Sequence, residues 1–194
     1  MRDEFYADRR DLWKWTIALN EAAHRNIVYV AMCRRSQTPI VPKGVRDDVG
    51  EFFVQEWKAL NTELRCARIV GLNKKIVPLL DPYIPNQADE YFGSVCRRIA
   101  SRTNGENLLV FVDPDTGIAE GNPTPKHVSL GHLELIWRAM HTGDALLVYQ
   151  HNLHESREQW VVRKQRKLAE ALRVSEGDVK STPHGDVHYF CVSK

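Results

Sequence analysis

The stretch "NLLVFVDPDTGIAEGNP", residues 107–123, runs from a continuous apolar segment directly into two aspartates. Residues 108–112 have the length and apolar character of a strand that is buried on both faces, as in a parallel sheet. Asp113 and Asp115 follow at once, with a proline between them and a glycine shortly after. A second apolar strand, "ALLVYQH" at 145–151, also ends in polar side chains. These two strands predict an α/β protein with polar groups at one sheet edge.

Amphipathic segments with helical spacing alternate with the strands along the chain. The predicted helices cover residues 7–25, 47–64, 87–102, 129–141 and 155–173, and the other predicted strands cover 26–33, 66–72 and two segments of 179–194. The tail strands are joined by a turn at 183–186. This order predicts a three-layer fold, a mostly parallel sheet flanked by helices with a C-terminal antiparallel hairpin. The length of 194 residues suits a single α/β domain, residues 1–194.

Composition narrows the class of protein and its surroundings. A formal net charge of +2 is too small to indicate nucleic-acid binding by itself. No apolar run reaches the roughly 20 residues that a membrane span needs, so no membrane partner is expected. The four cysteines show no CxxC spacing, which predicts no metal site and reduced thiols in a cytoplasmic protein. The tryptophans on helices, Trp13 among them, are predicted to lie in the core.

The residues after each buried strand are the candidate site. Ligands of open α/β sheets bind at the carboxyl ends of the strands, and a carboxylate beside an imidazole suits acid–base chemistry. We therefore predict Asp113, Asp115 and His151 as catalytic residues. The predicted substrate-binding residues are Thr116, Gly117, Lys126, His127, Tyr149, Gln150, Asn152 and His154. The alternative is that Asp113 caps a turn and His151 is an ordinary hydrogen-bonded residue at a strand end.

Basic residues occur in pairs that can form a phosphate-binding face. The predicted contacts to a nucleic-acid backbone are Arg9, Arg10, Arg34, Arg35, Lys164 and Lys167. The alternative is that these residues lie on solvated helix faces and loops.

The Asp113-Pro114 motif after a strand resembles the corresponding region of Rossmann-like adenine-N6 methyltransferases. The segment Asp11-Leu12-Trp13-Lys14-Trp15 is similar to a pattern on the N-terminal helix of the bacterial ribosomal-RNA members. The resemblance implies that Asp113 accepts the target amine. S-adenosylmethionine binding requires a glycine-rich turn after the first strand, and here the first glycine after that strand is Gly44. We therefore expect no cofactor.

A second resemblance, in layout, is to the uracil-DNA glycosylase superfamily, through "LLVYQHNLHESREQW" at 146–160. It implies that Asp113 or Asp115 positions water, that His151 or Asn152 contacts the departing base, and that aromatic residues stack on a flipped base. The leading hypothesis is a cofactor-independent DNA N-glycosylase, a hydrolase that acts on modified bases in defence against phage. A methyltransferase-like enzyme and a non-catalytic nucleic-acid-binding module are the alternatives.

Overall fold

The computed structural model describes residues 9–32, 76–79, 83–102, 105–119, 121–151 and 157–194. The helix predicted at 47–64 and the strand predicted at 66–72 lie outside these residues. No helix in the described part of the chain is long and apolar enough to cross a membrane.

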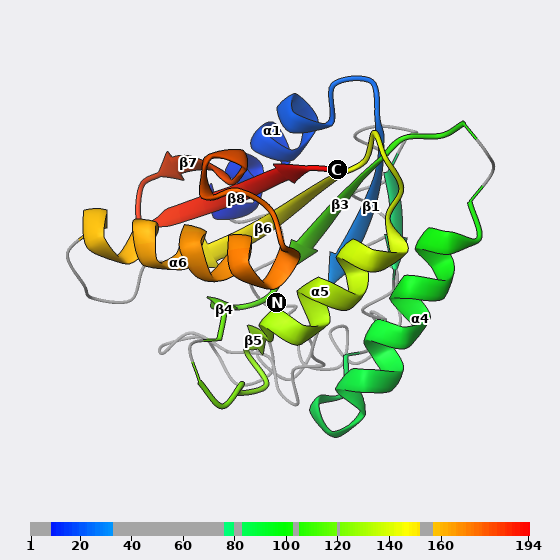
Figure 1. The fold of residues 1–194 in the computed structure, drawn as a ribbon, viewed down its shortest axis with the longest axis horizontal. Helices are drawn as coiled ribbons and strands as arrows, with labels where there is room; N and C mark the ends of the chain where they lie inside the picture. Colours follow the sequence, from blue (N-terminus) through cyan, green and yellow to red (C-terminus); the bar gives the residue numbers. More distant parts are fainter. Residues whose placement is uncertain (1–8, 33–75, 80–82, 103–104, 120, 152–156) are drawn as a thin grey trace, which may run out of the picture.

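A six-stranded mixed sheet forms the centre of the fold (Figure 1), in the order β2-β1-β3-β6-β8-β7. Strands β2, β1, β3 and β6 run parallel, β8 runs antiparallel to β6, and β7 pairs antiparallel with β8. The predicted α/β class, the mostly parallel sheet and the C-terminal hairpin are confirmed. The strands are β1 (Asn26–Ala31), β2 (Ile76–Leu79), β3 (Leu108–Asp113), β6 (Ala145–His151), β7 (Lys180–His184) and β8 (Val187–Ser193).

Helices cover both faces of this sheet (Figure 1). Helix α1 (Arg9–Ala22) packs on one face, and α4 (Ala88–Ala100), α5 (Leu130–Ala139) and α6 (Arg157–Leu172) pack on the other. Each helix contributes an apolar stripe to the core, as the sequence spacing predicts. The remaining short elements are η3 (Pro85–Gln87), η4 (Glu176–Asp178) and a two-stranded parallel sheet of β4 (Gly117–Ile118) and β5 (His127–Val128).

Strand β3 is buried along its whole length, and its side chains alternate between the two cores. Leu109 and Phe111 pack with α1, whereas Val110 and Val112 pack with the helices of the opposite face. Because successive strand side chains point to opposite faces, Asp113 follows Phe111 onto the α1 face. The alternation therefore decides which neighbours the first carboxylate of the motif meets.

The strand order places Asp113 at the topological switch point of the sheet. The chain adds β2 on one side of β1 and β3 on the other, and Ala31 of β1 lies opposite Asp113 of β3. Open α/β sheets bind ligands outside the carboxyl ends of the strands at the point where the strand order reverses. The end of β3 therefore lies where this fold class places its sites.

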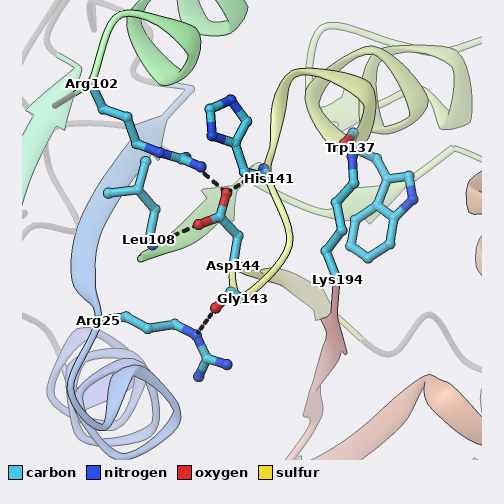
Figure 2. A network of polar contacts seen from close by, with 8 residues as sticks. All are labelled: Arg25, Arg102, Leu108, Trp137, His141, Gly143, Asp144 and Lys194. Carbon is cyan, nitrogen blue, oxygen red and sulfur yellow. Dashed lines mark hydrogen bonds and ion pairs between the residues drawn. The ribbon is translucent and has the colours of Figure 1, made fainter. Parts of the chain in front are cut away.

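At the opposite ends of the same strands, a second buried aspartate, Asp144, directly precedes β6 (Figure 2). Its Oδ1 accepts a hydrogen bond of 2.8 Å from the Leu108 amide. Its Oδ2 accepts bonds from the Arg102 guanidinium at 2.8 Å and from the His141 amide at 2.7 Å. Both oxygens are thus satisfied by groups that fix the starts of β3 and β6. Asp144 is a structural residue, and it provides a comparison for Asp113.

Candidate functional site

Asp113 lies at the centre of a buried polar group at the carboxyl end of β3. It is fully buried, and its Oδ2 accepts a 2.7 Å hydrogen bond from the Tyr29 hydroxyl on β1. The Lys14 ammonium on α1 lies 3.0 Å from Oδ1 and 3.1 Å from Oδ2. We call Lys14, Tyr29 and Asp113 the β3-end triad. Helix α1, strand β1 and strand β3 thus each contribute one residue to the triad. Together these residues hold the Asp113 carboxylate beside the Lys14 ammonium at the switch point.

The apolar stripe of α1 carries Lys14 into this position. Lys14, Ala18 and Ala22 recur every four residues, so they share the helix face that packs on the sheet. The ammonium lies 4.5 Å from the centre of the Tyr149 ring on β6, a cation–π contact. The Tyr149 ring in turn meets the Tyr189 ring at 5.7 Å. Aromatic walls therefore keep the surroundings of the triad poor in water, which strengthens charge interactions there.

The two buried aspartates differ in how their oxygens are satisfied. Both oxygens of Asp144 accept hydrogen bonds, whereas Oδ1 of Asp113 accepts none from any described residue, although Lys14 Nζ lies close to it. A buried acceptor without a hydrogen bond is uncommon in folded proteins and often marks a catalytic group or the place of a bound water. Oδ1 of Asp113 can therefore accept a hydrogen bond from a group outside the described residues, such as a water molecule or a ligand.

His151, the last residue of β6, is oriented by a carboxylate. Its Nε2 lies 3.0 Å from Oδ2 of Asp186, in the turn between β7 and β8. Strand alternation puts His151 on the same face as Tyr149 and Asp113. The register of β3 and β6 pairs Val112 with Val148, so His151 lies two residues beyond the position opposite Asp113. Strand spacing and rise then place the Cα atoms of Asp113 and His151 about 8 Å apart.

Gln150, a predicted substrate-binding residue, points to the other face and is fully buried. Its amide oxygen accepts from the Ile118 amide at 2.7 Å, and its nitrogen donates to the carbonyls of Thr116 and His151. Gly117 has φ +125°, and a Cβ there would lie 2.3 Å from the Gln150 side chain. The hydrogen bonds of Gln150 thus hold the backbone of the loop after Asp113 in place. A glycine is required at position 117 because φ is positive there and a side chain would collide with Gln150.

The second aspartate of the motif has different neighbours from the first. Burial lowers the pKa of the His127 imidazole, the charges of Lys164 and Lys126 lower it further, and the Asp115 carboxylate raises it by less. His127 Nδ1 also lies 2.7 Å from the Thr124 hydroxyl. The loop therefore carries a second group of charges next to α6.

Lys164 differs from its predicted role as a surface contact to a nucleic-acid backbone. It is only 3% exposed, and its ammonium donates to the Ile118 carbonyl at 2.6 Å. Its charge therefore lies inside the fold, where it holds the loop after β3. Lys167 of the same helix is half-buried, and Lys126 is exposed.

An exposed aromatic pair lies beside the β7–β8 turn. Trp13 of α1 is 40% exposed, so its predicted place in the core is wrong. Its ring lies 4.0 Å from the ring of His184 at the end of β7, with the planes 31° apart. Lys14 and Trp13 are successive residues of a helix and so point about 100° apart, one toward the β3-end triad and the other toward β7.

The remaining predicted site residues lie on α1 or outside the described residues. Arg9 and Arg10 form the first turn of α1. Arg34, Arg35, Asn152 and His154 lie outside the described residues. Lys14 and Tyr29 are members of the site that the sequence pattern does not predict, although Lys14 carries one signal. Lys14 is a charged residue between two tryptophans, on the stripe that α1 buries.

Among residues whose placement is described, no group of three or more His, Cys, Asp or Glu side chains is arranged to hold a metal ion. Comparison with models of known protein families finds no match, and comparison with curated proteins finds no similar sequence.

Proposed function

We propose that the protein is a cofactor-independent DNA N-glycosylase of the cytoplasm whose site is centred on the β3-end triad. The observation that carries the proposal is the Asp113 carboxylate, which is buried at the switch point, faces the Lys14 ammonium and accepts no hydrogen bond at Oδ1 from the described residues. A carboxylate in this state can accept a proton from a water molecule and can offset positive charge on a sugar. The fixed geometry of the triad reduces the reorganisation that such a step requires.

In the proposed reaction the base–sugar bond breaks and its electron pair leaves with the base. His151, oriented by Asp186, donates a hydrogen bond to the departing base. Water directed by Asp113 adds to C1′ of the sugar and gives a proton to the carboxylate. That proton then passes to the departing base anion, which restores the Asp113 carboxylate. The free base and an abasic sugar, which opens to an aldehyde, are the products.

DNA is the proposed partner because the chemistry requires a base that leaves the helical stack. Trp13, exposed beside His184, offers an aromatic face on which a flipped or unpaired base can stack. Modified bases such as those of phage DNA belong among the candidate substrates.

The test is release of free base from a panel of oligonucleotides with modified and unmodified bases, followed by alkali and gel analysis. We expect base release by the wild type and loss of release by Asp113→Asn. Asp144→Asn is the matched control, because it also removes a buried charge paired with a cation but at the amino end of β6, away from the carboxyl end of β3. Both variants are first shown to be folded by circular dichroism. Absence of base release from every substrate would refute the proposal.

A methyltransferase-like activity is the second candidate. The observation that favours it is that Asp113 and Pro114 follow a strand directly beside β1, at the end of the sheet where a Rossmann-like fold holds its cofactor. In this reaction Oδ1 of Asp113 would accept a hydrogen bond from the amine of the target base. Titration calorimetry with S-adenosylmethionine separates the two candidates, since micromolar binding supports this one and absence of binding supports the glycosylase.

A further inference from the structure

The side chain of Lys14 combines three features that suit a nucleophilic amine. It is 7% exposed, its ammonium lies 4.5 Å from the centre of the Tyr149 ring, and the Asp113 carboxylate, a proton acceptor, lies 3.0 Å from the ammonium. Lysines in poorly hydrated sites with a nearby base form Schiff bases with carbonyl compounds. The other lysine that is buried in the described chain, Lys164, donates to the Ile118 carbonyl on the opposite side of the sheet. Lys14 is thus the amine at the switch point.

We propose that Lys14 forms an imine with the C1′ aldehyde of an abasic deoxyribose. This inference rests on the proposed function, whose product carries that aldehyde. Asp113 first takes a proton from the ammonium, which leaves a neutral amine. The amine nitrogen then bonds to C1′, and the carbonyl oxygen leaves as water with one proton from the amine and one returned by Asp113. Hydrolysis reverses these steps and restores the lysine, so no oxidant or reductant is consumed.

The geometry gives each member of the triad a defined part in this step. Tyr29 holds Oδ2 at 2.7 Å, so the oxygen nearest to Lys14, Oδ1, is the one that exchanges the proton. Burial of Lys14 limits the access of bulk water and thereby slows hydrolysis of an imine. His151, held by Asp186, lies farther along β6 and is not needed for imine formation.

The experiment uses the full chain and an oligonucleotide with a preformed abasic site. Sodium borohydride reduces an imine to a stable amine, so a covalent protein–DNA species on a denaturing gel reports the imine. Digestion and mass spectrometry then locate the sugar adduct, which we expect on Lys14. An oligonucleotide with a tetrahydrofuran abasic analogue, which has no aldehyde, should give no adduct.

The matched variant is Lys14→Arg, which keeps the positive charge beside Asp113 but cannot form an imine. Thermal unfolding establishes that the variant is folded, and we expect loss of the borohydride adduct. If that variant does not fold, the position of the adduct on the wild-type chain decides alone. An adduct on another lysine, an adduct that persists in Lys14→Arg, or no adduct with wild type at saturating DNA would overturn the inference.

The role proposed for Lys14 and the proposed glycosylase function can be refuted independently of each other. Adduct formation at Lys14 with abasic DNA, without release of base from any intact strand, would refute the glycosylase and leave the imine chemistry in place. Release of base without an adduct would support the glycosylase and refute the role of Lys14.

Discussion

Removal of one charge from the β3-end triad should destabilise the fold more than removal of both charges. Asp113→Asn removes the negative charge beside the buried Lys14 ammonium, and Lys14→Met removes the positive charge beside Asp113, whose other partner among the described residues is the Tyr29 hydroxyl. Breaking a buried ion pair by deleting one partner costs about 3–5 kcal/mol. For a domain of this size that cost lowers the Tm by about 6–20 °C.

The double variant Lys14→Met/Asp113→Asn removes both buried charges and keeps an acceptor for Tyr29. Replacing a buried ion pair by uncharged groups of similar volume is often neutral or stabilising. We therefore expect the double variant to cost less than either single variant, rather than the about 6–10 kcal/mol that the two single costs would add up to.

Urea unfolding followed by circular dichroism measures all four members of this cycle. The control is the pair Arg138–Glu134 on the surface of α5, whose atoms lie 2.6 Å apart and whose side chains are 62% and 31% exposed. Exposed pairs contribute about 0–1 kcal/mol, so the control cycle should be close to additive. Single triad variants within about 1 kcal/mol of wild type, or additive costs in the double variant, would refute the reasoning.

Three further predictions concern the loop after β3, a titrating histidine and a buried thiol. Gly117→Ala should destabilise the protein by more than about 1 kcal/mol in urea unfolding, because φ is positive and Gln150 fills the space. Gly121→Ala should have little effect, because no atom of the described residues lies within 4 Å of the Cβ position of Gly121. Burial lowers the pKa of His127 below 6.5, so the imidazole binds a proton more weakly in the folded chain than in the unfolded chain. The free energy of unfolding should therefore be highest above pH 6.5 and should fall as the pH decreases through the folded pKa. Urea unfolding at several pH values measures this slope, and His127→Gln should flatten it. Burial raises the pKa of Cys191 to about 12, so iodoacetamide near neutral pH should label it only after unfolding; equal labelling of native and denatured protein would contradict this.

The order of elements could be read from the chain because its signals are local. The strand predicted at 145–151 has those bounds, and the strand predicted at 108–112 extends only to Asp113. The helices predicted at 87–102 and 129–141 end within two residues of α4 and α5. Long apolar runs and helical spacing dominate these segments, so their type depends little on distant contacts.

The members of the site could be predicted only in part. Asp113 was selected because it follows a buried strand, a local signal. Gln150 and Lys164 were assigned to ligand contacts because their residue types suit such contacts, yet their polar atoms bind the loop backbone near Ile118. Residue type does not reveal which neighbour a side chain meets, because that depends on the face of the strand or helix it occupies.

The sequence by itself determined an α/β sheet with carboxylates at a strand end. Only the tertiary structure decided that the two aspartates of one motif belong to different surroundings, and that Lys14, 99 residues away, neutralises the first. The physical reason is that strand alternation divides neighbouring residues between two faces, and that a helix stripe brings a distant charge to one of them. A buried carboxylate needs such a partner, and the chain order does not show which residue will provide it.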